Sequence, residues 1–376
     1  MELPADGVCD FIFYDSLKEP FGKLGRPSRG KFKTFQTFAA VAKQTQFGVS
    51  IYALDIGQFL AHLNKPTATA WAKEKLWNHK IYHWGVMNMH QTITDVPGYF
   101  ENALLTLKKA ADISKPSATK RVASYTFLGY YGKKQVACEE AAQHLQTIHT
   151  PHVVVLLGHI SFKEDEIATE VPNFICIIVP PSIYKFPPSV MAKLVYGHTY
   201  EAATGMVTCI SQKGIKPPPV YAVSVTLKGR WYTPKVDDID EAKIGAYAVF
   251  EQCDSFREYT IPQRICTKTK TKYISNLELN DTGLYMQTYD KKPGTKQTLV
   301  FDSTMTQVKK ICEARYKDTK HAYTIAAYDV NYDYATSACP KKIPGGYSRT
   351  QSYKKLVKFL ANFKGKQQAD CLAIIN

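Results

Sequence analysis

Several common signatures are missing from the 376-residue sequence. No pair of cysteines has the CxxC spacing, which disfavours a zinc ribbon or a thioredoxin-type redox site. No GxGxxG turn follows an apolar run, which counts against a dinucleotide-binding fold. No apolar run approaches the roughly 18 residues of a membrane span. The first ten residues, MELPADGVCD, have acids where a signal peptide has bases, so the chain as given is predicted to be soluble.

The composition is that of a basic globular protein. Hydrophobic residues make up 45% of the chain, and 48 Lys and Arg residues against 33 Asp and Glu residues give a net charge of +15. Such a surface attracts polyanions, although a solvated basic surface without a partner explains the same excess. We do not expect nucleic acid as a partner, because no recognisable reader motif accompanies the charge.

The nine cysteines leave the redox state open. They can be buried thiols or several disulfides, and their odd number means that at least one has no partner within the chain. They are Cys9, Cys138, Cys176, Cys209, Cys253, Cys266, Cys312, Cys339 and Cys371.

Short apolar runs alternate with amphipathic patterns at the spacing of βα units. The predicted strands are 9–14, 47–54, 81–89, 121–128, 152–158, 221–227 and 323–328. The predicted helices are 32–44, 67–79, 99–113, 135–148, 199–212, 302–315 and 353–363. Continuous apolar strands separated by helices are typical of a parallel sheet covered on both faces. About seven such units favour an α/β fold of the TIM-barrel type.

The rhythm is interrupted after Trp231 by a stretch rich in Thr, Lys and Tyr. We therefore predict a barrel formed by residues 1–230 and 299–376, and a small α+β insertion formed by residues 231–298 before the last strand.

Several segments, in this order, resemble glycoside hydrolase family 18, the chitinases and chitinase-like proteins, in a divergent form closest to those of arthropods. GVCDFIFYDSL resembles the second strand of that family, and Gly229–Arg230 resembles the end of its seventh strand, with Lys228 in place of a tyrosine. LVFDSTMTQVKKI resembles the start of its last helix, and Tyr323–Asp333 resembles its eighth strand. The resemblance implies a (β/α)8 barrel with an α+β insertion.

The resemblance also places the chain outside the cell. The first strand of the family has no counterpart before Cys9. In relatives that strand has a cysteine bonded to the one that opens strand two, so a partner for Cys9 is expected upstream. We therefore expect a longer precursor with a signal peptide and an extracellular or secreted protein.

Active members of the family have the motif DxxDxDxE at the end of strand four. There the glutamate protonates the glycosidic oxygen and the preceding aspartate orients the substrate's N-acetyl group. The motif falls here on Trp84, Met87, Met89 and Gln91, so every carboxylate is replaced. An amide cannot act as a general acid, and the resemblance therefore implies a pseudoenzyme without catalytic residues.

Polar and aromatic residues at the ends of the other strands are candidates for ligand binding. They are Asp15, Asp55, Gln91, Arg230, Trp231, Tyr328 and Asp329. If displaced carboxylates among them converge, an active glycoside hydrolase is the alternative. The tryptophan on which relatives bind chitin is replaced here by Ala326.

The sequence thus favours a catalytically inactive chitinase-like protein that binds a carbohydrate, chitin-like or other, or a protein. Polyanion binding by lysine clusters, among them Lys268, Lys270 and Lys272, Lys291–Lys292, and Lys309–Lys310, is a further alternative. No cofactor is expected. No metal is expected either, because His79 and His83 lie on either side of a predicted helix-to-strand change.

Overall fold

A computed structural model describes most of the chain. The described residues are 2–17, 29–90, 98–114, 123–132, 135–160, 175–188, 197–235, 249–266, 273, 276–280, 285–290, 297–318, 321–333, 343, 347–363 and 365–375. They belong to two compact units. Unit 1 contains Leu3–Leu156 and Gly205–Ala222, and unit 2 contains Leu157–Thr204 and Val223–Asn376.

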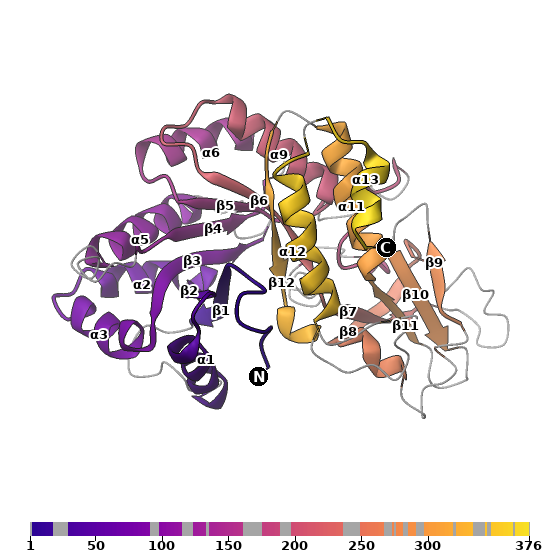
Figure 1. Cartoon of the computed structure of the whole chain (residues 1–376), viewed down its shortest axis with the longest axis horizontal. Coiled ribbons are helices and arrows are strands. Elements are labelled where there is room, and N and C mark those ends of the chain that lie inside the picture. Colours follow the sequence, from indigo (N-terminus) through magenta and orange to yellow (C-terminus); the bar gives the residue numbers. More distant parts are fainter. Residues whose placement is uncertain are drawn as a thin grey trace. The chain divides into compact units, whose positions relative to one another are not determined.

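Unit 1 is built on parallel strands that are neighbours in chain order, β1-β2-β3-β4-β5 (Figure 1). Their bounds are β1 Phe11–Leu17, β2 Gln46–Ile51, β3 Ile81–Met89, β4 Thr126–Tyr130 and β5 Val153–Leu156. Strand β6 (Val220–Thr226) begins in this unit, where the Val220 N–H donates to the His152 carbonyl at 2.9 Å. Parallel neighbours need a crossover connection, which the intervening helices supply.

The helices of this part of the chain are α1 Arg29–Val41, α2 Ile56–Leu63, α3 Ala68–Lys75, α5 Tyr99–Ser114, α6 Gln135–Thr147 and α9 Tyr200–Gln212, with the 3₁₀ turns η1 Ala53–Asp55 and η2 Trp77–His79. Alternate residues of β3 face opposite sides of the sheet. On one side Trp84 is fully buried against Phe59 of α2 and Trp71 of α3, and its indole N–H donates to the Ser114 hydroxyl of α5 at 3.0 Å. Trp84 therefore joins the strand to its helical layer.

Aromatic rings fill the other side of the sheet. The Phe13 ring packs edge-on against Phe127, with centroids 4.5 Å apart. It lies so close to β2 that a Cβ on Gly48 would be 2.4 Å from it, so this position requires glycine.

Unit 2 holds the rest of β6, whose next neighbour in the sheet is β12 (Thr324–Tyr328), and a second, antiparallel sheet of order β8-β7-β11-β10-β9. The bounds of the second sheet are β7 Gly229–Pro234, β8 Cys253–Thr260, β9 Glu278–Asn280, β10 Tyr285–Asp290 and β11 Gln297–Phe301. Its core includes Trp231, Ile265, Leu299 and Phe301.

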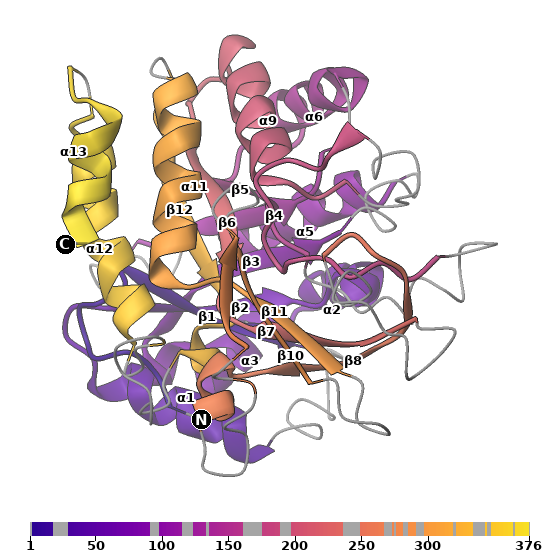
Figure 2. The same ribbon diagram turned by 90° about the vertical axis from the view of Figure 1, so that its right-hand side faces the viewer.

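Helices α11 (Thr304–Lys317), α12 (Ser348–Leu360) and α13 (Gln368–Leu372) of unit 2 lie side by side (Figure 2). The 3₁₀ turns are η5 Pro262–Cys266, η7 Val330–Tyr332 and η8 Ala373–Ile375. Helix α11 begins with an N-cap, because the Ser303 hydroxyl accepts from the Thr306 N–H at 3.2 Å.

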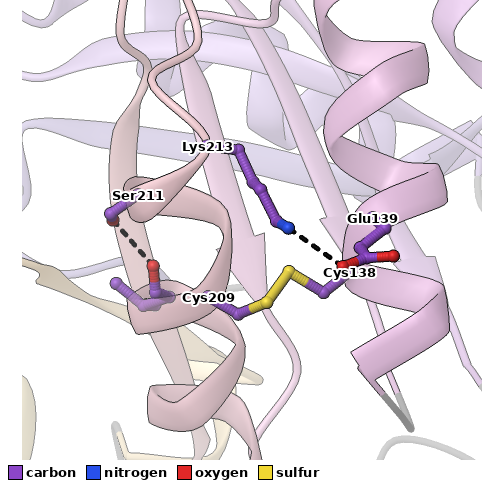
Figure 3. The surroundings of a disulfide bond; sticks show 6 residues. Cys138, Glu139, Cys209, Ser211 and Lys213 are labelled. Carbon is purple, nitrogen blue, oxygen red and sulfur yellow. Dashed lines mark hydrogen bonds and ion pairs between the residues drawn. A yellow bond between two sulfur atoms is a disulfide. The ribbon is translucent and has the colours of Figure 1, made fainter.

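Disulfides connect elements within each unit. Cys138–Cys209 joins α6 to α9 in unit 1 (Figure 3). In unit 2, Cys312–Cys371 joins α11 to α13, and Cys176–Cys253 ties the apolar run at 174–179 to the start of β8. The sequence had left open whether the cysteines are thiols or disulfides, and these three pairs are disulfides.

The strongest sequence patterns predicted their elements well. The strand predicted at 81–89 has those bounds, and the helix predicted at 99–113 ends one residue later. The sequence analysis missed α2, which is short and has Gly57 at its second position. Its buried residues Ile56, Phe59 and Leu63 nevertheless have helical spacing, so the signal was present.

Candidate functional site

Two buried methionines lie at the end of β3 in the described part of unit 1. They are Met87 and Met89, which the sequence resemblance assigned to two acid positions of the motif. A Cβ on Gly85 would lie 3.0 Å from the Met87 side chain and 3.2 Å from the Phe13 ring, so Met87 covers the aromatic face of the sheet. Gln91, the last position of the motif, lies outside the described residues.

Two of the predicted carboxylates belong to unit 1. Asp15 is exposed near the end of β1 and accepts a hydrogen bond from the Asn88 side chain of β3. Asp55 is half-buried directly before α2, and its side chain does not cap that helix. Asp15 is therefore hydrogen-bonded to a residue at the end of β3.

A polar cluster lies in unit 2 at the carboxyl ends of β6 and β12. We call Thr226, Lys228, Asp329, His159 and Tyr328 the strand-end cluster. The Thr226 hydroxyl donates to Asp329 Oδ2 at 2.5 Å, and the Lys228 ammonium lies 3.3 Å from the same oxygen. Asp329 has a left-handed backbone, with φ of 58°, where the chain turns from β12 into η7.

The electrostatics of the strand-end cluster keep Asp329 ionised. Burial alone would raise the pKa of this carboxyl group, but the Lys228 ammonium and the Thr226 hydroxyl together outweigh burial and lower the pKa. The Lys228 ammonium also lies over the Tyr259 ring, 3.6 Å from its centroid. Asp329 is therefore a charged hydrogen-bond acceptor at neutral pH rather than a proton donor.

His159 completes the cluster as a neutral ring. Its Nδ1 lies 2.7 Å from the Ser224 hydroxyl oxygen, which also accepts from the Gly158 N–H at 2.9 Å. Its ring lies 4.5 Å from that of Tyr328. Burial is the main cause that lowers the pKa of His159 to about 3, and its Nε2 has no partner among the described residues. His159 was not among the residues predicted for the site, although it directly follows the predicted strand 152–158.

Arg230 and Trp231 are both enclosed in unit 2. Arg230 is fully buried: its Nε–H donates to the Tyr232 hydroxyl at 2.8 Å, and the guanidinium lies 4.8 Å from the centroid of the Phe256 ring. Trp231 is also buried, edge-on to Tyr273 with centroids 5.0 Å apart. Both predicted ligand-binding side chains therefore pack inside the unit in this structure.

One lysine pair predicted to lie on a basic surface is corrected by the structure. Lys310 is fully buried and forms an ion pair with Asp302 at 2.5 Å, because one face of α11 packs inward. The Lys268, Lys270 and Lys272 cluster and Lys291–Lys292 lie outside the described residues.

Within the described ranges, no three His, Cys, Asp or Glu side chains are grouped as a metal ion would require. No helix in that part of the chain is long and apolar enough to span a bilayer.

Sequence comparison finds no matching family model and no matching curated protein. Solved structures do match. An immunomodulatory active chitinase from Trichuris suis, TsES1, is 13% identical with a TM-score of 0.59, over 95% of this chain and 92% of its own. The human pseudo-chitinase YKL-39, described as retaining chitooligosaccharide binding, is 12% identical with a TM-score of 0.61, over 94% and 92%. The Group IV chitinase of Ostrinia furnacalis is 9% identical with a TM-score of 0.61, also over 94% and 92%.

The chain therefore has the α/β fold of the family 18 chitinases and chitinase-like proteins, the (β/α)8 barrel type predicted from the sequence. At these levels of identity the similarity defines the fold, and what the chain does has to be inferred from its own residues.

Proposed function

We propose that this protein is a divergent, secreted family 18 chitinase-like protein that binds a carbohydrate and does not hydrolyse it. The fold supports this proposal, since the neighbours include both chitinases and a pseudo-chitinase described as binding chitooligosaccharides. The disulfides among the described residues support an extracellular location, because such bonds persist in oxidising compartments.

The loss of hydrolysis follows from the end of β3. Substrate-assisted cleavage needs one carboxylic acid to protonate the leaving oxygen and a second to orient the N-acetyl group. Met87 and Met89 are thioethers packed against the sheet, and neither can transfer a proton. Asp329 is no replacement for the acid, since a general acid needs a raised pKa and the pKa of Asp329 is lowered.

The observation that carries the binding proposal is the orientation of the Asp329 carboxylate. Its Oδ2 is engaged by Thr226 and Lys228, whereas no described residue bonds to Oδ1, and 26% of the side chain is exposed. A carboxylate oxygen held in place in this way accepts hydrogen bonds from sugar hydroxyls. The half-buried Tyr328 ring directly precedes it, and an aromatic ring next to a fixed acceptor suits the apolar face and the hydroxyl edge of a sugar.

Calorimetric titration with an N-acetylglucosamine tetramer, preceded by a glycan array, tests this proposal. Asp329→Asn should weaken binding by roughly ten- to a hundredfold, because a hydrogen bond to a charged acceptor is lost. Asp254→Asn, an exposed acid on β8, is the charge-matched control and should bind as the wild type does. Equal affinity of the wild type and Asp329→Asn, with the fold verified by circular dichroism, would refute the role of Asp329.

The same proteins test the enzyme alternative with a fluorogenic chitobioside. We expect no turnover above the uncatalysed rate. Turnover that survives Gln91→Ala and is lost in Asp329→Asn would instead establish a hydrolase with relocated carboxylates.

Polyanion binding is a second candidate, supported by the exposed lysines Lys354, Lys355 and Lys358 of α12. Binding of a heparin-like polymer through these residues should weaken steeply with added salt, by analogy with counterion release from nucleic acids.

We also propose the division into a barrel, 1–230 with 299–376, and an insertion, 231–298. The antiparallel pairing of β7, β8, β9, β10 and β11 supports it.

A further inference from the structure

A group of histidines lies at the other end of the strands of unit 1, close to their amino-terminal residues. His83 of β3 is buried, and the Tyr125 N–H donates to its Nδ1 at 3.1 Å. His152, just before β5, has the same role for the next residue: the Thr126 N–H donates to its Nδ1 at 3.0 Å. Two consecutive N–H groups at the start of β4 are therefore bound by imidazole nitrogens.

These two bonds fix the protonation state of both rings. A nitrogen that accepts from an N–H carries no proton, so each ring is neutral with its proton on Nε2. For His83, the Nε2–H donates to the Gln46 side-chain oxygen at 2.9 Å. A second proton on either imidazole would have to bind to Nδ1. That proton would then point at the backbone N–H from which Nδ1 now accepts a hydrogen bond.

The surroundings oppose a positive charge on these rings. His83 packs edge-on against Phe11 of β1 and stacks on Tyr125, with centroids 5.1 and 5.3 Å apart. The pKa of His83 is lowered to about 4, mainly by burial and in addition by the nearby His152. Burial also lowers the pKa of His152.

Other titratable groups face the same end of the sheet. His149 Nε2 lies 3.0 Å from the Thr126 hydroxyl, and burial lowers the pKa of His149 to about 4. On α5, Lys108 lowers and Asp112 raises the pKa of His149. Lys80, at the start of β3, donates to the Ala42 carbonyl behind α1. Asp112 therefore opposes the lowering of the pKa at His149.

We propose that His83 and His152 form an acid-sensitive latch, in which protonation breaks the two hydrogen bonds that hold the start of β4 and thereby opens unit 1. The latch is closed near neutral pH. Because both rings bind protons less readily when folded than when unfolded, stability is complete above about pH 6.5 and is lost as the pH falls toward 4.

The test compares acid unfolding of the wild type with that of His83→Asn/His152→Asn. An asparagine side-chain oxygen can take the place of Nδ1 as acceptor but cannot be protonated in this range. Tryptophan fluorescence follows unit 1, which contains Trp71, Trp77 and Trp84 of the four tryptophans. The acid midpoint should fall by roughly 0.5–1 pH unit in the double variant. His79→Asn, a half-buried histidine of η2, is the control and should leave the midpoint unchanged.

Two results would overturn the latch. One is an unchanged acid midpoint in His83→Asn/His152→Asn when the variant is as stable as the wild type at pH 8. The other, which does not depend on how well the variant folds, is an NMR titration of the wild type in which both imidazoles take up their protons near pH 6.5.

Discussion

Removal of the disulfide between Cys138 and Cys209 should destabilise unit 1 by about 4 kcal/mol. The bond joins α6 to α9 across 71 residues (Figure 3). A cross-link over that separation removes about 15 cal/mol/K of entropy from the unfolded chain, which at 25 °C corresponds to roughly 4 kcal/mol of stability. Cys138 is also fully buried, so replacing it with alanine adds a small packing loss.

A matched control lies beside this disulfide. The Lys213 ammonium is 3.1 Å from the Glu139 carboxylate and connects the same two helical regions, as Figure 3 shows. Both side chains of the pair are exposed to solvent, 38% for Lys213 and 59% for Glu139, so Lys213→Met should cost less than about 1 kcal/mol.

The assay is urea unfolding followed by tryptophan fluorescence, with the oxidised state of the wild type verified by mass spectrometry. Cys138→Ala/Cys209→Ala should show a large decrease in unfolding free energy, and Lys213→Met almost none. If the double variant loses less than about 1 kcal/mol, then restriction of the unfolded chain does not explain the role of this bond.

Two further predictions concern buried and bonded charges. Lys310→Met should destabilise unit 2 by about 3–5 kcal/mol, because it leaves the Asp302 carboxyl buried without its ammonium, and Lys310→Met/Asp302→Leu should recover much of the loss in urea unfolding. Equal losses in the single and double variants would contradict this account. Asp6 accepts hydrogen bonds from the N–H groups of Lys43, Gln44 and Thr45, and the Thr45 bond is the main cause that lowers its pKa to about 2. Its contribution is present above pH 4 and is lost as the pH falls through 2. Asp6→Asn should therefore flatten the pH dependence of stability in that range. An unchanged dependence of the thermal unfolding midpoint on pH would exclude this contribution of Asp6.

Much of the fold could be predicted because its strands and helices have strong local patterns. The run Ile81–Met89 is mostly apolar, as is typical of a strand covered on both faces, and its bounds were predicted correctly. The order of such segments was enough to identify the resemblance to family 18. The prediction that Met87 and Met89 replace the acids of the motif also came from this run, by alignment to the family, and it stays a prediction.

The candidate site was predicted only in part. Tyr328 and Asp329 were identified because they lie at the carboxyl end of a predicted strand, where barrels place their functional side chains. Thr226 and Lys228 lie about a hundred residues earlier, and nothing local indicates that they meet Asp329. Arg230 was a candidate because it also lies just after a predicted strand. Its side chain is nevertheless fully buried against aromatic rings.

The sequence by itself determined the α/β fold and the fold resemblance to family 18, because these depend on patterns along single stretches of chain. Tertiary structure decided which cysteines pair, that Lys310 is buried rather than part of a basic surface, and that Asp329 is held ionised by Lys228. The charge and exposure of a side chain depend on neighbours that are distant in the sequence, so the positions of those neighbours must be known first.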